Sequence, residues 1–326
     1  MAHFAAQDRA HADRSDVGSL PPLMRGRLAC PGCGTSRLTS REAELRCEDC
    51  SALYPMDRGI PVMVPHMAGR PAVSLQKAGQ AAFTDEEIDV QYETVRPHCT
   101  PLIHAELLIS KMRRGIRGLE SIIRGGTALV VCGGSGMDAE FLARAGARVV
   151  STDISSGGAA RVRERASRYG LDVTAAVADA EHLPFQNRSF DLVWVHDGLH
   201  HLEDPAAALL EMARVARHAV SVNEPARAAV TALATRLGLA QAREESGNEV
   251  ARLRREDVAR VLESRGFMVL TTERYAMVYR HKAGPVYRLL SRQSLARTGL
   301  TATRAAETLL GPIGNKLSVR AIRATS

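Results

Sequence analysis

A glycine-rich turn between two apolar segments constrains the fold of this chain more than any other feature. Residues 128–131 read Ala-Leu-Val-Val, an apolar run of the kind that forms a strand buried on both faces. The small residues 132–136 (Cys-Gly-Gly-Ser-Gly) let the backbone turn sharply and approach a ligand. A helical pattern follows at 137–145, and a second strand ends at Asp153. This β-α-β unit predicts a nucleotide-like ligand whose ribose hydroxyls bind Asp153.

Further apolar runs predict more strands of the same α/β sheet. They cover Val173–Ala178, Ser189–Val195 and Ala219–Val222, with helices expected at 158–169 and 205–217. Polar side chains follow the carboxyl ends of the predicted strands, and open parallel sheets bind ligands at that edge. The candidates at this edge are Asp153, Asp179, His196, Asp197, Asn223 and Glu224.

Several motifs of this region occur together in one known family. They are the turn at 133–136, Asp153-Ile154-Ser155, Ala178–Phe185 (Ala-Asp-Ala-Glu-His-Leu-Pro-Phe), Phe190–Val193, and Leu199–Leu202 (Leu-His-His-Leu). With these motifs, residues 127–225 resemble a class I S-adenosylmethionine-dependent methyltransferase of the small-molecule type. The resemblance implies a Rossmann-like sheet of seven strands, whose last strand, Lys316–Ile322, runs antiparallel.

The resemblance also implies which residues bind S-adenosylmethionine. Asp153 would bind the ribose, Ile154 would lie against adenine, and Asp179 would accept a hydrogen bond from the adenine amino group. The full implied set is Cys132, Gly133, Gly134, Gly136, Asp153, Ile154, Asp179, Ala180 and His196. The chain departs from the family pattern where Val130 replaces an acid and Cys132 replaces a glycine. Asp138 and Asp197 are the carboxylates that would compensate for the missing acid.

Methyl transfer from a sulfonium needs an aligned nucleophile and often a group that removes its proton. His200 and His201 lie at the predicted ligand edge, and a neutral imidazole suits this task near pH 7. Glu224 is an alternative base, or a ligand for an amine. The competing interpretation is architectural, with one imidazole of the Leu-His-His-Leu turn capping backbone groups.

Four of the six cysteines form two Cys-x-x-Cys pairs. Cys30 and Cys33 make the first pair, and Cys47 and Cys50 make the second. This spacing predicts a ribbon in which four thiolates surround Zn²⁺ in a tetrahedron. Because four protein ligands leave no open coordination position, the predicted metal is structural.

These features predict four parts of the chain. Residues 1–26 have no signal-peptide pattern and are expected to be a disordered leader. The zinc ribbon covers 27–66, a linker and helical cap cover 67–126, and the methyltransferase domain covers 127–326 with an insertion at about 283–312. No run approaches the ~18 apolar residues of a membrane span. The cysteine usage indicates a reducing, cytoplasmic location.

The net charge of +7 belongs to the last part of the chain. From Lys282 onward, eight Lys or Arg residues face one acid, Glu307, which indicates either a solvated basic face or a surface that contacts phosphates or a membrane. Only six Tyr and six Phe are present, few for a stacking platform, so a small-molecule acceptor in secondary metabolism is the leading hypothesis. RNA is the alternative substrate, because the ribbon resembles those of certain RNA methyltransferases. A non-catalytic scaffold that binds the cofactor is the third. The sequence does not predict the oligomeric state.

Overall fold

The structure is a computed structural model. It describes residues 20–41, 43–67, 70–71, 74–87, 89–227, 253–277, 283–292 and 294–324. The sequence pattern of residues 226–239 predicts an amphipathic helix, which falls mostly outside these residues, as does most of the predicted leader. The polar run at 244–249, which could fold over the ligand edge, lies wholly outside them. None of the helices in the described part has the length and apolar character needed to cross a bilayer.

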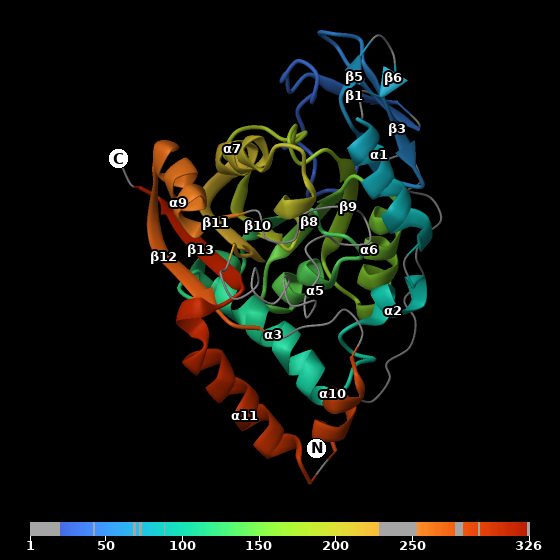
Figure 1. Cartoon of the computed structure of the whole chain (residues 1–326). Helices are drawn as coiled ribbons and strands as arrows, with labels where there is room; N and C mark the ends of the chain where they lie inside the picture. The colour runs from blue at the N-terminus through green and yellow to red at the C-terminus, as the bar shows by residue number, and fades with distance from the viewer. Residues whose placement is uncertain are drawn as a thin grey trace.

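Seven consecutive strands of one mixed sheet form the centre of the molecule. Figure 1 shows this sheet between the helices. In spatial order these are β9 (Val173–Ala178), β8 (Arg148–Asp153), β7 (Thr127–Val131), β10 (Phe190–His196), β11 (Ala216–Pro225), β13 (Lys316–Arg323) and β12 (Phe267–Tyr275). Neighbours from β9 to β11 pair in parallel, and β13 pairs antiparallel with both β11 and β12. The expected antiparallel last strand is confirmed, and it lies inside the sheet because β12 pairs with its outer side.

Helices cover both faces of this sheet. One face packs on α3 (Leu102–Ile116), α4 (Glu120–Ile123), α5 (Met137–Arg144) and α6 (Ser156–Tyr169). The other face packs on α7 (Pro205–Val215) and α9 (Arg255–Ser264). All five residues of β7 are buried, as expected for a strand in the middle layer.

The cysteine-containing segment extends the sheet. Its strands are β1 (Leu38–Arg41), β2 (Glu44–Cys47), β3 (Leu53–Asp57) and β4 (Ile60–Met63). β4 pairs in parallel with β9, with Met63 opposite Ala178, so one sheet runs through eleven strands of the described residues. The predicted total of seven strands is therefore too low. Side chains of this segment also join the main core, since Leu45, Tyr54 and Phe185 belong to one buried cluster.

The segment between the ribbon and β7 is mainly helical. It contains the two-stranded pair β5 (His66–Met67) and β6 (Arg70–Pro71), then α1 (Leu75–Ala82), a π-helical turn at Phe83–Glu87, and α2 (Val90–Val95). α2 and the π-helical turn contact α6, so this segment covers part of the ligand edge.

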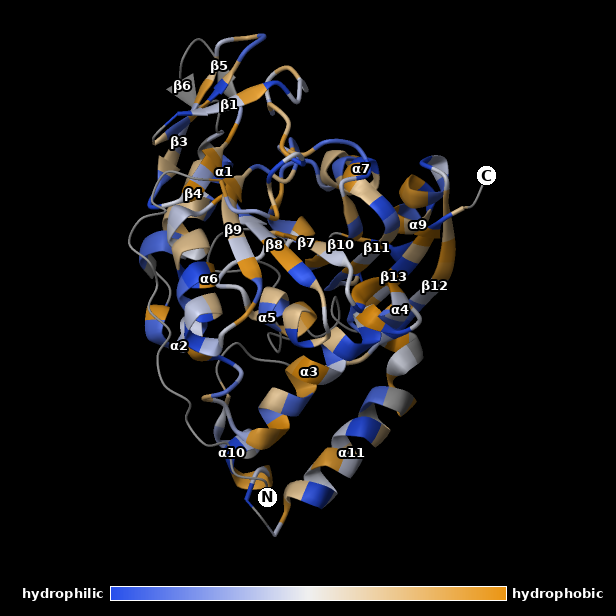
Figure 2. Cartoon of the chain, turned by 180° about the vertical axis from the view of Figure 1, so that it is seen from behind, coloured by the Kyte–Doolittle hydropathy of each residue, from blue (hydrophilic) through white to orange (hydrophobic). Residues whose placement is uncertain are grey.

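The predicted insertion before β13 is also helical. It holds α10 (Pro285–Leu290), α11 (Ala296–Leu309) and a short 3-10 turn at Gly311–Ile313. Figure 2 shows polar and apolar residues alternating along α11, and both helices contact α3. The insertion therefore packs on the body of the protein.

Candidate functional site

The carboxyl edge of the parallel strands brings most of the predicted site residues together. β7 leads into the glycine turn, and β8 ends at Asp153. β9, β10 and β11 are followed or ended by Asp179, His196 and Glu224. The order of the strands in the sheet places these ends side by side.

The glycine turn depends on backbone conformations and close packing that larger side chains disfavour. The Gly133 N–H donates to Thr152 O over 2.8 Å, and a Cβ on Gly133 would overlap Ser151 Oγ. Gly136 begins α5 with φ +82°. Cys132, which stands where the family pattern has glycine, also has a positive φ, +54°. The sequence departs from the pattern here, and the backbone of Cys132 lies in the left-handed region, which favours glycine.

Asp153 connects this turn to the start of α6. Its two carboxylate oxygens accept from the N–H groups of Gly134 (2.9 Å) and Ser155 (3.0 Å). Burial raises the pKa of Asp153, while these two N–H groups favour its ionised form. Asp85, from the π-helical turn, accepts from the Gly157 N–H over 2.7 Å and from the Ser155 hydroxyl. Asp85 was not predicted as part of this site.

Asp179 lies at the end of β9 in a buried ion pair. Lys77, from α1, donates to Asp179 Oδ2 over 2.6 Å and to Glu181 Oε2 over 2.9 Å. Asp179 also accepts from the Glu181 N–H over 3.0 Å. Sequence reasoning placed Lys77 in a linker, and no motif marks it as part of the ligand edge.

Two carboxylate–imidazole pairs involve the last residue of β10 and the turn after it. His196 Nδ1 lies 2.9 and 3.1 Å from the two carboxylate oxygens of Asp138, and both residues are buried. His200 Nδ1 lies 2.9 Å from Glu224 Oε2, and its ring stacks on that of His201 with centroids 4.0 Å apart. Glu224 Oε1 also accepts from the N–H groups of Gly198 (2.8 Å) and Leu199 (2.9 Å).

This arrangement does not fit the prediction that Glu224 takes a proton from the acceptor. Its side chain is fully buried, and both of its oxygens accept hydrogen bonds from the loop after β10. Glu224 therefore fixes the position of that loop and of His200.

Two lysines that the motifs did not reveal converge beside these pairs. Lys111, from α3, donates to Asp197 Oδ2, and Lys316, from β13, lies 3.1 Å from both oxygens of Asp197. Burial lowers the pKa of Lys111 to about 7, although Asp197 opposes that shift. The two ammonium groups hold the pKa of Asp197 well below its ordinary value.

The four predicted zinc ligands lie together in one cluster of the ribbon. Their sulfur atoms are within 4.8 Å of one another, and Cys30–Cys50 and Cys33–Cys47 are each separated by 3.6 Å. Zn–S bonds of about 2.3 Å in a tetrahedron separate the sulfurs by about 3.8 Å, so the thiolates fit this metal. The Tyr54 hydroxyl lies 3.0 Å from Cys30 Sγ and can support the ligand from outside.

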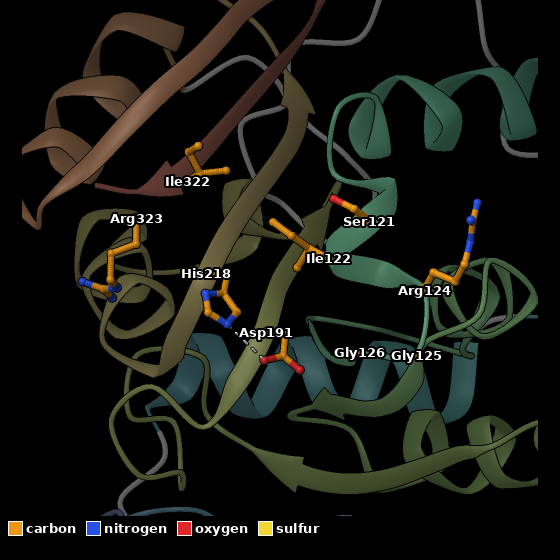
Figure 3. Close-up of a pocket in the computed structure, with 9 residues that line it drawn as sticks. All are labelled: Ser121, Ile122, Arg124, Gly125, Gly126, Asp191, His218, Ile322 and Arg323. Atoms are coloured by element: carbon orange, nitrogen blue, oxygen red, sulfur yellow. Dashed lines mark ion pairs between the residues drawn. The ribbon is translucent and has the colours of Figure 1, made fainter. Parts of the chain in front are cut away.

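A pocket lies at the amino ends of the parallel strands, opposite the edge described above (Figure 3). Figure 3 shows His218 facing Asp191, with Nε2 and Oδ1 3.7 Å apart. Asp191 also accepts from the Thr127 N–H and hydroxyl over 2.8 Å each, which ties β10 to β7. This pocket shares no residue with the glycine turn, so it is not the predicted cofactor site.

Comparison with known proteins identifies the type of domain that carries this edge. Residues 129–221 match a family model described as a methyltransferase domain. The chain is 41% identical over 97 residues to a demethylmenaquinone methyltransferase of Thermobifida fusca, covering 28% of this chain and 40% of that protein. It is 38% identical over 87 residues to methyltransferase GfsG of Streptomyces halstedii, covering 26% and 31%. The chain thus spans less than half the length of these relatives.

One solved structure of similar fold is the magnesium protoporphyrin IX methyltransferase of Synechocystis PCC 6803 with bound SAH. The two chains superpose with a TM-score of 0.51 over 76% of this chain and 100% of that one, at 14% identity. At this identity the likeness concerns the fold. Residues 129–221 therefore form a methyltransferase domain, and the fold around them is that of the class I S-adenosylmethionine-dependent methyltransferases.

Proposed function

We propose that this protein binds S-adenosylmethionine at the carboxyl edge of its sheet and transfers the methyl group to a small-molecule acceptor, in the biosynthesis of a secondary metabolite. The geometry of Asp153 carries the proposal. This carboxylate orders the glycine turn and the start of α6 through the N–H groups of Gly134 and Ser155. Each of its oxygens keeps a second lone pair for a ribose hydroxyl.

The residues at this edge fit the cofactor. Gly134 has φ +49°, and a Cβ built on it meets no atom within 4 Å, so the turn leaves room for the methionine part. Ile154 is partly exposed beside Asp153, where it would lie against adenine. Asp179 and the Ala180 backbone would bind the adenine amino group, with Lys77 holding Asp179 in place. Cys132, Gly133, Gly136 and His196 complete the proposed set.

When bound, the cofactor supplies an electrophilic methyl group on a sulfonium. The chain must exclude water, align the acceptor and remove a proton where the acceptor carries one. His200 and His201, which the sequence predicted for this role, lie at the same edge, and Glu224 positions His200. Val130, which replaces the usual acid, is fully buried. Since Asp138 and Asp197 are paired with His196 and the two lysines, neither is an unengaged substitute for that acid.

We further propose a structural Zn²⁺ bound by Cys30, Cys33, Cys47 and Cys50. The thiolates of these four residues fit a tetrahedron and leave no position for a substrate. Six unpaired cysteines support a reducing, cytoplasmic location.

The structure favours a small-molecule acceptor over RNA, because several cations of the basic segment are engaged internally. Lys316 binds Asp197. Arg320 donates to Arg117 O, and Arg323 donates to the carbonyls of Ala213 and Ala216 while stacking on the Phe267 ring. Labelled methyl transfer from S-adenosylmethionine to a metabolite extract, compared with transfer to RNA, separates the two acceptors. Tight cofactor binding with label in neither pool would favour the scaffold.

Calorimetry with S-adenosylmethionine tests the cofactor site. We expect Asp153→Asn to weaken binding about 10- to 100-fold, because charged hydrogen bonds to the ribose contribute about 1.5–3 kcal/mol. Asp172→Asn, a matched change at an exposed position beside β9, should leave the affinity unchanged. Equal affinity for the Asp153 variant and the unmodified protein would refute the site.

A further inference from the structure

Of the two imidazoles paired with carboxylates, His196 has the ring nitrogen suited to accept a proton. Its Nδ1 lies against Asp138, and its buried Nε2 has no hydrogen-bond partner among the residues that the structure describes. Because a carboxylate accepts hydrogen bonds, Nδ1 carries the proton in the neutral ring and Nε2 carries the lone pair. A buried lone pair without a donor calls for a donor from outside the chain.

The contacts of Asp197 Oδ2 indicate where a hydroxyl group of a ligand could lie and donate to His196 Nε2. This oxygen lies 3.1 Å from Lys316 Nζ and 3.7 Å from His196 Nε2, and it accepts from Lys111 Nζ. Each ammonium has three N–H donors. In the part of the chain that the structure covers, Asp197 accepts hydrogen bonds from both Lys111 and Lys316. Its side chain is 28% exposed, whereas Lys111 is 2% exposed, so a ligand would approach past Asp197.

We propose that His196 is the catalytic base of the methyl transfer and that Lys111 and Lys316 bind the acceptor oxygen from which it takes the proton. Asp138 is a positioning residue that holds the reactive tautomer. This inference rests on the proposed function and names the class of acceptor: a phenol- or enol-type hydroxyl compound. A protonated amine would meet two buried ammonium groups, which disfavour it.

The chemical step balances without a further reactant. The acceptor hydroxyl gives its proton to His196 Nε2. The electron pair of the broken O–H bond stays on the oxygen, and an oxygen lone pair forms the new O–CH₃ bond. The S–CH₃ bond breaks with both electrons remaining on sulfur, so the sulfonium becomes a neutral thioether. The protonated imidazole is stabilised by Asp138.

His200 is less suited to this role. Its side chain is 2% exposed, its Nδ1 is bound by Glu224, and its ring stacks on His201. Its carboxylate partner also holds the loop backbone at Gly198 and Leu199. The Glu224–His200 pair therefore maintains the loop that carries Asp197 next to His196, the last residue of β10.

Binding of 4-nitrophenol to the full chain saturated with S-adenosylhomocysteine tests the oxygen site, because the phenolate absorbs visible light and the phenol does not. We expect the bound probe to ionise at a pH at least one unit below that of the free probe. Lys111→Met should lower the ratio of bound phenolate to phenol about tenfold, which corresponds to one pKa unit. Arg113→Met, an exposed position on the same helix, should not change it.

Several charged or titratable groups surround this site and contribute to the pH profile. They are Asp138 on α5, Lys111 on α3, Glu224 on β11, Tyr275 on β12, Lys316 on β13, and Asp197 and His200 in the loop after β10. The base is therefore identified by counting protons. Calorimetry at about pH 6, where Lys111 is already protonated, is done in two buffers of different ionisation enthalpy. It should show no proton release when the unmodified protein binds 4-nitrophenol, since His196 keeps the proton.

His196→Gln should release about one proton per bound probe, or bind the probe as the phenol. Asp138→Asn keeps the shape of the pair and should give an intermediate proton count. His218→Gln is the matched control, because that exposed imidazole also lies beside a carboxylate but at the opposite edge of the sheet.

Three results would overturn the proposal: no saturable binding of 4-nitrophenol, a bound probe with unshifted ionisation, or a His196→Gln variant that binds the probe as phenolate without releasing a proton. Affinity for S-adenosylhomocysteine is measured in the same experiments. Its absence in the unmodified protein would count against the proposed function itself. If the protein binds the cofactor and transfers methyl groups, but bound 4-nitrophenol shows neither the shifted ionisation nor the expected proton count, only this inference is contradicted.

Discussion

Lys111 places an ammonium group in the interior of the protein, where its desolvation exceeds the attraction of Asp197. The pKa of this lysine falls from an ordinary value of 10.5 to about 7 in the folded chain. Between those values the unfolded chain holds a proton that the folded chain lacks. The contribution of Lys111 to folding stability is therefore least favourable below about pH 7 and improves as the pH rises.

We expect the stability of the unmodified protein, measured relative to Lys111→Met, to rise between about pH 7 and about pH 9. The upper limit is about 1.4 kcal/mol per pH unit, from linkage. Urea unfolding of both proteins at several pH values measures the difference. Asp197 does not titrate in this range, since its pKa is held well below the ordinary value. Parallel stability curves for the two proteins would contradict the expectation.

The sequence allowed candidate site residues to be predicted where they follow a strand within the methyltransferase motifs. Asp153, Asp179 and His196 are of this kind, because strand ends can be located from apolar runs. Lys77, Lys111 and Lys316 reach the same edge from elements outside those motifs. Their role depends on tertiary packing, since a lysine on a helix or at the start of a strand is ordinarily solvated.

Two loops at the carboxyl edge are in such close contact that a single added carbon would separate them. A Cβ on Gly198 would overlap the Cβ of Cys132, the residue held at φ +54°. Gly198 lies between Asp197 and the Leu199–His201 turn. Its contact with Cys132 therefore aligns the loop after β10 with the glycine turn.

We expect Gly198→Ala to destabilise the fold by about 1–3 kcal/mol, as overpacking does in a well-packed core. Cys132→Gly removes the opposing Cβ and frees the strained backbone, so the double variant should recover much of that loss. Urea unfolding of the four proteins of this double-mutant cycle measures the coupling. Purely additive effects would show that the two loops do not compete for the same space.

The ribbon supports the segment proposed to bind adenine from two sides. β4 pairs with β9 directly before Asp179, and Leu28 bridges to Phe185. The Ala29 N–H also donates to Pro184 O over 3.0 Å. Residues 179–185 therefore lie between two backbone attachments to the cysteine-containing segment.

We expect removal of zinc by a chelator to weaken S-adenosylmethionine binding, because loss of the ribbon frees this segment while α5, α7 and the central strands stay packed. Calorimetry before and after chelation, with circular dichroism to follow the sheet, measures the effect. Cys50→Ser should behave like the chelated protein, and Cys99→Ser, at an exposed position outside the thiolate cluster, should not. Unchanged affinity after complete metal loss would show that the ribbon does not support the site.

At the scale of the whole molecule, the sequence predicted the central sheet, its antiparallel last strand and its ligand edge. Those features follow from local patterns of apolar runs and strand-end polar residues. The pairing of β4 with β9 was missed, because it joins residues more than a hundred positions apart and no local pattern marks it. The basic charge of the last segment also did not predict which of its cations face solvent. Lys316, Arg320 and Arg323 donate hydrogen bonds to groups within the fold.

β13 follows β12 in the chain but lies between β11 and β12 in the sheet. During synthesis on the ribosome, β12 emerges with no neighbour to receive it, and the sheet stays open until the later strand inserts. Lys316 is the first residue of that inserting strand, so the acceptor side would be the last region to mature. A nascent chain stalled before this point would display an apolar edge to chaperones, however completely its glycine turn had formed.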